Sequence, residues 1–161
     1  GAKGRLGKII RTLPIAHVAG GAVFVHAGLL PGWALGGVEI LNLMGRDAWR
    51  TARFYGSLPR THLFRNGAGP LWNRSIAEGN DARALQQTLD MLGVRRMVVG
   101  HTQTEHLGGD KGRVLLRQKD RLVCVDVGLR AGDVSSHAAL VLQGASGWQW
   151  REGGLTPLFR G

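Results

Sequence analysis

Two short apolar runs that each end at a histidine constrain the fold of this chain most. Residues 22–25 are followed at once by His26, and residues 97–99 are followed by Gly100 and His101. Such runs, bounded by turn residues, are typical of strands that are buried on both faces of a sheet. If the two strands share one sheet, both histidines can reach the edge at which open α/β sheets bind their ligands.

Helical spacing marks two other segments. Apolar residues recur with arginines between them from residue 38 to about residue 54, which predicts a helix that could break at Gly45. Residues 81–92 predict a better-defined helix, with its leucines on one face, Asn80 as the N-cap and Gly93 as a left-handed C-cap.

The remaining segments predict connections and strands. Glycines and prolines in residues 56–79 indicate a long irregular connection, and such connections are often functional. Residues 113–117 and 122–127 should pair as a hairpin, and 138–142 should form a further strand. The expected fold class is therefore α/β, of the α+β kind with a mixed sheet.

The length and charge of the chain bound its function. With 161 residues and 43% hydrophobic content, it can form one core, as one domain or as part of one. A net charge of +10 favours phosphate-bearing partners. A basic nucleic-acid-binding module is therefore one alternative. The basic residues are scattered along the chain and no aromatic-interleaved motif accompanies them, which favours a solvated surface instead.

The sequence predicts a soluble protein and leaves its compartment, cytoplasmic or organellar, undetermined. No run approaches the roughly 18 apolar residues that span a membrane, and the first residues lack the apolar core of a secretory signal. The single cysteine, Cys124, lies in an apolar run, which predicts a buried thiol and excludes a disulfide framework.

His26 and His101 are the candidate metal ligands. Imidazole suits Mn, Fe, Zn or Ni, and the residue type does not choose among them. A histidine at the end of a strand can also be a hydrogen-bonded structural residue. The matching positions of the two histidines leave the structural and the metal-binding interpretations equally open.

Four segments, in this order, resemble those of the calcineurin-like (PPP-type) metallophosphoesterases. They are Phe-Val-His-Ala-Gly-Leu-Leu-Pro at 24–31, Leu-Trp-Asn-Arg at 71–74, Val-Val-Gly-His-Thr-Gln at 98–103 and Val-Asp-Val-Gly-Leu at 125–129. The second and third segments, with their flanking residues, resemble the Shewanella-like protein phosphatase branch.

The resemblance implies a fold and a site. The fold would be the C-terminal half of the four-layer β-sandwich of metallophosphoesterases. His26 and His101 would both ligate one metal of a dinuclear divalent centre (Mn, Fe or Zn), and Arg74 would hold a phosphate oxygen unless it is only a surface arginine. Asp126 is expected to orient a loop or to pair with a basic neighbour, and it is not assigned as a ligand. The other four histidines are expected to be structural or exposed: His17, His62, His106 and His137.

Three motifs of the family's first half do not occur in this sequence. They are Gly-Asp-x-His-Gly, Gly-Asp-x-x-x-Asp-Arg-Gly and Gly-Asn-His-Glu, which supply the other metal ligands and the histidine that protonates the leaving group. We therefore expect residues 1–161 to be a partial calcineurin-like phosphoesterase domain, without the N-terminal metal-binding half. The first residue is Gly1, which fits either a processed product or a fragment of a longer chain.

The implied activity is metal-dependent phosphoester hydrolysis. The resemblance favours a protein phosphatase, a phosphoric monoester hydrolase that acts on a phosphorylated protein, with the isolated chain inactive and no catalytic residue assigned within it. Two alternatives remain besides the nucleic-acid-binding module. One is a dinucleotide polyphosphate hydrolase, because His26, Ala27 and Gly28 also resemble that relative and Trp33 follows at a similar distance. The other is a scaffold that binds phosphoproteins without turnover.

Overall fold

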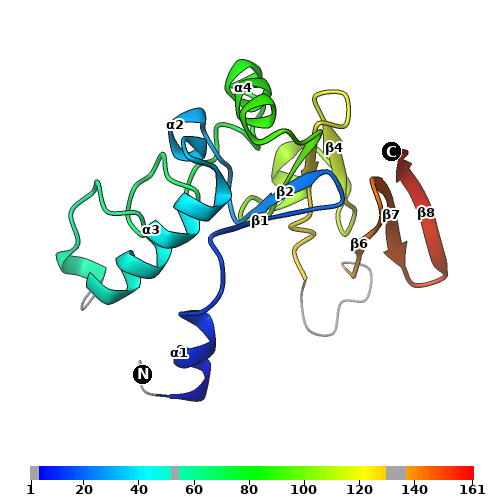
Figure 1. Ribbon diagram of the computed structural model, residues 1–161. Helices are drawn as coiled ribbons and strands as arrows, with labels where there is room; N and C mark the ends of the chain where they lie inside the picture. Colours follow the sequence, from blue (N-terminus) through cyan, green and yellow to red (C-terminus); the bar gives the residue numbers. More distant parts are fainter. Residues whose placement is uncertain (1–3, 52–54, 130–136) are drawn as a thin grey trace.

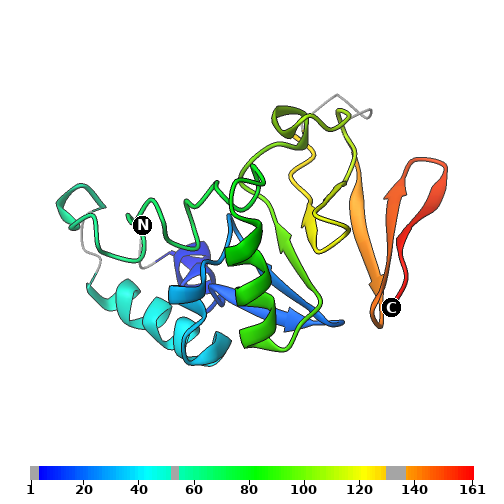
Figure 2. The same ribbon diagram turned by 90° about the horizontal axis from the view of Figure 1, so that it is seen from above.

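The computed structural model describes residues 4–51, 55–129 and 137–161. These residues stack as a layer of helices, a five-stranded sheet and a three-stranded sheet, in that order (Figure 1, Figure 2). The α/β class with a mixed sheet, predicted from the sequence, is confirmed.

The five-stranded sheet carries the two apolar runs at its centre. Its strand order is β1 (Ala16–Ala19), β2 (Ala22–Val25), β3 (Arg96–Val99), β5 (Leu122–Cys124) and β4 (Leu115–Arg117). The three central strands are parallel to one another, and the two edge strands are antiparallel to their neighbours. The sheet is therefore mixed, and its parallel core places the ends of β2 and β3 at one edge.

The described residues form four α-helices. They are α1 (Arg5–Ile10), α2 (Pro31–Ala34), α3 (Gly37–Thr51) and α4 (Ala82–Leu92). Helix α1 buries no residue and lies apart from the sheet (Figure 1). Two short 3-10 helices complete the set: η1 (Tyr55–Ser57) and η2 (Thr104–Leu107).

Helix α4 matches its predicted range, but its N-cap lies one residue later than expected. The side chain of Asp81, not Asn80, accepts the hydrogen bond from the Ala84 N–H at 3.2 Å. The Asn80 amide instead donates to the carboxylate of Glu78. An acidic cap also suits the positive end of the helix dipole. Gly93 closes the helix with φ of 62°, as predicted.

Helix α3 is continuous at Gly45, contrary to the break considered above. A Cβ at Gly45 would lie 2.4 Å from Cγ1 of Ile15, so a glycine here permits close packing of the helix on the segment before β1. The amide of Asn42 makes the same connection, with its Oδ1 accepting from the N–H groups of Ile15 and Ala16. Residues 52–54, into which the predicted helix extended, lie outside the described residues.

The third layer consists of the strands β6 (Ala139–Gln143), β7 (Ser146–Arg151) and β8 (Gly154–Phe159), paired antiparallel in that order. Only the first of them was predicted. The predicted hairpin is present as β4 and β5, shorter than expected. Its turn residues have positive φ: Gln118, Lys119 and Asp120.

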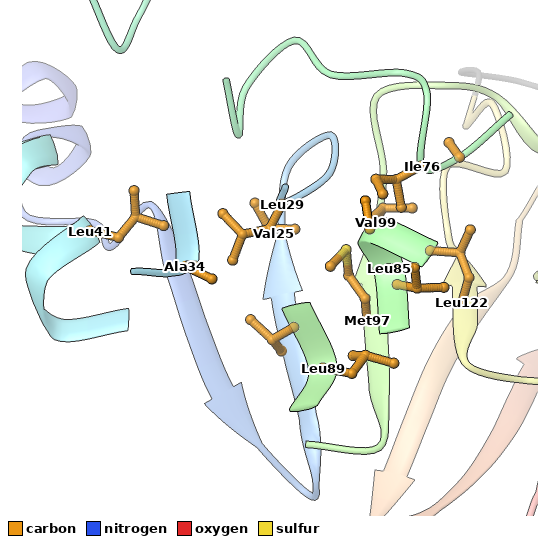
Figure 3. Packing of buried hydrophobic residues seen from close by; sticks show 14 of the residues in the cluster. Val25, Leu29, Ala34, Leu41, Ile76, Leu85, Leu89, Met97, Val99 and Leu122 are labelled. Carbon is orange, nitrogen blue, oxygen red and sulfur yellow. The ribbon is translucent and has the colours of Figure 1, made fainter. Parts of the chain in front are cut away.

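Alternation along the central strands divides the core in two. Val25, Met97 and Val99 face the helices and pack with Leu85 and Leu89 of α4 (Figure 3). On the other face of these strands, Ala22, Val98 and Val123 form a second cluster with Phe159 of β8, in the three-stranded sheet. Because both faces are covered, the backbone at the ends of β2 and β3 is held in place, which positions whatever side chains follow.

Candidate functional site

Strand register brings His26 and His101 together. Val25 and Val99 are partners in the parallel pairing of β2 and β3, so the histidines that follow them emerge at the same edge. The Gly100 N–H donates to the His26 carbonyl at 2.8 Å, which continues the pairing beyond the strands. Nε2 of His26 lies 3.1 Å from Nδ1 of His101, and the ring centroids are 4.9 Å apart. The convergence expected from the sequence is present.

The backbone of His101 is unusual. Its φ is +63°, a left-handed conformation that residues other than glycine, asparagine and aspartate rarely adopt. Such conformations cost free energy and are concentrated at functional sites. A hydrogen bond closes the turn around His101: the Thr102 N–H donates to the Gly100 carbonyl at 2.7 Å.

The surroundings of His101 favour its neutral form. The ring is half-buried, and this burial lowers the pKa of His101; the charges of His26 and Arg74 lower it further, while Asp126 opposes them. Its Nε2 atom is buried and has no hydrogen-bond partner among residues 4–51, 55–129 and 137–161. A neutral imidazole has a lone pair to offer, and metal ligation requires that form.

The two facing nitrogens fit a shared metal ion. With metal–nitrogen bonds of about 2.0–2.1 Å, neighbouring ligands of a tetrahedral or octahedral centre lie about 3 Å apart. The same separation suits a hydrogen bond between one protonated and one bare ring nitrogen. Among the described residues, no group of three or more His, Cys, Asp or Glu side chains could hold a metal. The role of the pair as metal ligands thus stays a prediction.

Arg74 lies near the pair, on the irregular connection. Its side chain is exposed, and its charge acts on His101. Within the described part of the chain, its guanidinium makes no hydrogen bond or ion pair. The donors of Arg74 are therefore available to an anion, and its phosphate-binding role stays a prediction.

Asp126 behaves as a loop-orienting residue, as expected. Its carboxylate accepts from the Gly128 N–H at 3.2 Å, and its carbonyl accepts from the Thr104 N–H at 2.8 Å. These bonds tie the segment after β5 to the segment after His101. The carboxylate also raises the pKa of His101 against the larger lowering effects.

Trp72 lies at the site, although no role for it was predicted from the sequence. Its ring stands edge-on to His101, with centroids 5.6 Å apart, and its Nε1–H donates to the Phe64 carbonyl at 2.8 Å. The loop that carries it is tied to the His26 turn, because the Ala27 N–H donates to the Pro70 carbonyl at 2.9 Å. The segment 71–74 was the available signal, but no local pattern names a partner on a distant strand.

The other four histidines take up other positions. His62 accepts from the Phe64 N–H through Nδ1 at 3.2 Å, which is a structural contact. His17 is exposed on β1, His106 is exposed beside Glu105, and His137 is half-buried.

No family model matches the chain, but comparison with known proteins yields two relatives by sequence. It is 32% identical to Shewanella-like protein phosphatase 2 of Arabidopsis thaliana over 120 residues, which cover 71% of this chain and 29% of that protein. It is 29% identical to an uncharacterized protein of Schizosaccharomyces pombe over 124 residues, covering 74% of this chain and 35% of that protein.

Solved structures share the fold. A cold-active protein-tyrosine phosphatase of a psychrophilic Shewanella species superposes with a TM-score of 0.80 at 21% identity, covering 99% of this chain and 47% of that one. Another structure of a cold-active protein tyrosine phosphatase gives a TM-score of 0.73 over 92% of this chain. The chain thus spans about a third of its curated relatives and less than half of these structures.

Two further findings bear on partners. The described part of the chain contains no helix with the length and apolar character needed to cross a membrane. None of the named relatives is described as a nucleic-acid-binding protein, so that alternative gains no support.

The resemblance that the sequence motifs carried is confirmed: this chain is a homologue of part of a Shewanella-like, PPP-type protein phosphatase, and its partial coverage fits the C-terminal half of that fold.

Proposed function

We propose that this chain is the C-terminal half of the catalytic domain of a metal-dependent protein phosphatase, in which His26 and His101 hold one divalent metal ion. The observation that carries the proposal is the 3.1 Å separation of His26 Nε2 and His101 Nδ1 at the shared end of two buried parallel strands. The Arabidopsis relative, named as a protein phosphatase, supports the reaction class.

The chain's residues would act by binding and positioning. His26 and His101 present two nitrogens to one ion, and the ring of Trp72 restrains His101. The planar guanidinium of Arg74 can offer paired donors to two oxygens of a phosphate group. A dinuclear centre of Mn, Fe or Zn, when bound, lowers the pKa of a water molecule and neutralises charge on the phosphate. The substrate would be a phosphorylated protein.

The described residues of this chain would supply only part of that centre. The remaining ligands would come from a segment that carries the aspartate and asparagine motifs of the family's first half. Below, "the complete domain" means these 161 residues joined to that segment. Uncatalysed phosphomonoester hydrolysis is among the slowest biological reactions, so most of the ligands must be present for useful turnover. The 161 residues by themselves should therefore have negligible activity.

The test is hydrolysis of para-nitrophenyl phosphate with added manganese. The complete domain should turn over, and His26→Ala or His101→Ala should each lower kcat/KM by about a thousandfold, because a metal ligand is lost. His106→Ala removes an exposed imidazole that does not belong to the pair and should leave the activity within about twofold of the parent. Clear turnover by the 161 residues alone, abolished by His101→Ala, would refute the half-domain proposal.

Metal binding gives a second readout that does not depend on turnover. Cobalt(II) titration of the complete domain should show visible absorption from nitrogen coordination, and His26→Ala and His101→Ala should each weaken binding of one cobalt equivalent. If both variants bind two equivalents as tightly as the parent, the histidines are a structural hydrogen-bonded pair.

A further inference from the structure

A basic groove lies beside the histidine pair, and the proposed reaction does not use it. It is lined by Arg60, Arg65, Gly67 and Trp72 and has a volume of about 460 Å³. The described residues that line it include no carboxylate. A concave surface lined by two arginines, with no carboxylate among its described lining residues, attracts anions.

Trp72 borders both the groove and the histidine pair. It lines the groove, and its ring also contacts His101 at 5.6 Å between centroids. The hydrogen bond from its Nε1 to the Phe64 carbonyl holds the indole in this place. A ligand group in the groove would therefore lie one aromatic ring away from the phosphate that is being hydrolysed.

The two arginines of the groove are held differently. Nη1 of Arg65 donates to the carbonyls of Gly56 and Leu58, which anchors this half-buried side chain to the loop. Arg60 is exposed, and within the described part of the chain its guanidinium makes no hydrogen bond or ion pair. Arg65 therefore shapes the groove, and the donors of Arg60 remain for a ligand.

We propose that this groove is an accessory subsite that binds the carboxylates of acidic residues flanking the phosphorylated residue of the substrate, with Arg60 as the specificity-determining residue. The proposal rests on the proposed function, because it presumes that a phosphopeptide occupies the adjoining site. A guanidinium pairs with carboxylate through charge-assisted, often bidentate hydrogen bonds. The distinctive property of the enzyme would be a preference for phosphorylated residues in acidic sequences.

The experiment compares three substrates of the complete domain loaded with manganese. Two are phosphopeptides of one sequence, with either two glutamates or two alanines beside the phosphorylated residue, and the third is para-nitrophenyl phosphate, which has no flank. Arg60→Ala should lower kcat/KM for the glutamate peptide by about three- to tenfold. The same variant should leave kcat/KM for the alanine peptide and for para-nitrophenyl phosphate unchanged. Arg60→Glu should invert the preference between the peptides.

Arg95→Ala is the matched control. Arg95 is an exposed arginine that precedes β3, at the end of that strand opposite to His101, so the variant makes the same change in net charge away from the groove. It should leave the peptide preference intact. The proposal is overturned if Arg60→Ala slows all three substrates equally, if the parent does not distinguish the peptides, or if Arg95→Ala has the same effect as Arg60→Ala.

A binding measurement separates failure of the phosphatase proposal from failure of the subsite proposal. If the complete domain hydrolyses none of the three substrates, the subsite is judged by fluorescence anisotropy with labelled peptides. Tighter binding of the glutamate peptide that Arg60→Ala removes supports the subsite. Equal binding of both peptides, or stronger competition by a single-stranded oligonucleotide than by the unlabelled glutamate peptide, overturns it.

Discussion

The indole of Trp72 meets the imidazole of His101 edge-on, with the ring planes at 89° and the centroids 5.6 Å apart. The contact joins the irregular connection to the end of β3. His101 adopts a left-handed backbone conformation, so neighbours that hold its ring oppose the relaxation of a strained turn. The geometry of the histidine pair therefore depends on a side chain that is not a ligand.

Trp72→Ala should loosen His101 without removing a ligand. Aromatic pairs of this geometry are worth about 0.5 to 1.5 kcal/mol, so cobalt(II) binding by the complete domain should weaken by about two- to tenfold. Trp72→Phe keeps a ring but loses the hydrogen bond to the Phe64 carbonyl. Its cobalt affinity should lie between those of Trp72→Ala and the parent. Equal cobalt affinity in all three proteins would show that the ring contact does not position His101.

Arg74→Ala should lower kcat/KM for para-nitrophenyl phosphate by about ten- to a hundredfold, because a charged donor to the phosphate is lost. Arg74→Lys restores the charge but not the planar fork, so it should recover only part of the activity. Metal affinity should change little in either variant. Unchanged kinetics in Arg74→Ala would show that Arg74 is only a surface arginine, which is the alternative considered from the sequence.

Arg96 should be important for stability and not for activity. It is nearly buried, pairs with Asp120 at 2.9 Å, donates to the Arg160 carbonyl at 3.0 Å and lies 4.0 Å over the ring of Phe159. Arg96→Ala removes these contacts between the two sheets and should lower the free energy of unfolding by about 2 to 4 kcal/mol.

Asp120→Ala is the comparison for that prediction. Asp120 is partly exposed, so its loss should cost less than about 1 kcal/mol. Urea unfolding monitored by circular dichroism measures both variants. Equal destabilisation by the two substitutions would show that the ion pair, and not the contact with the three-stranded sheet, dominates.

The thiol of Cys124 should be protonated and unreactive in the folded chain. Burial raises the pKa of Cys124 from its ordinary value of 9.0 to about 11, and Arg117 opposes this. At pH 8 the thiolate fraction should be about a hundredfold lower than in the unfolded chain, so Ellman's reagent should react at least that much more slowly without urea than with it. Rapid reaction of the folded protein would contradict the burial of this strand.

The same shift predicts a dependence of stability on pH. The thiol ionises more easily in the unfolded state, so its contribution is fully present below about pH 9 and decreases as the pH rises toward 11. The decrease should be smaller in Cys124→Ala, which lacks the group. Parallel curves of unfolding free energy against pH for the two proteins would show that the thiol does not contribute.

Elements with a strong local signal were predicted well. Helix α4 has a leucine face, an acidic cap and a terminal glycine, and all of these signals lie within its own residues. The buried strands β2 and β3 are short apolar runs closed by turns. Strands β1, β7 and β8 were not predicted. Their residues are of mixed composition, and such segments form strands only where a neighbouring strand pairs with them.

The sequence by itself determined which residues could carry the chemistry: two histidines after two buried strands, and an arginine within a segment that resembles a phosphatase. Only the tertiary structure decided that Val25 pairs with Val99 and so sets the two imidazoles face to face, and that Trp72 lies against one of them. The physical reason is that strand type depends on local composition, whereas register and ring contacts depend on side chains that meet only after the sheet and its covering layers have packed.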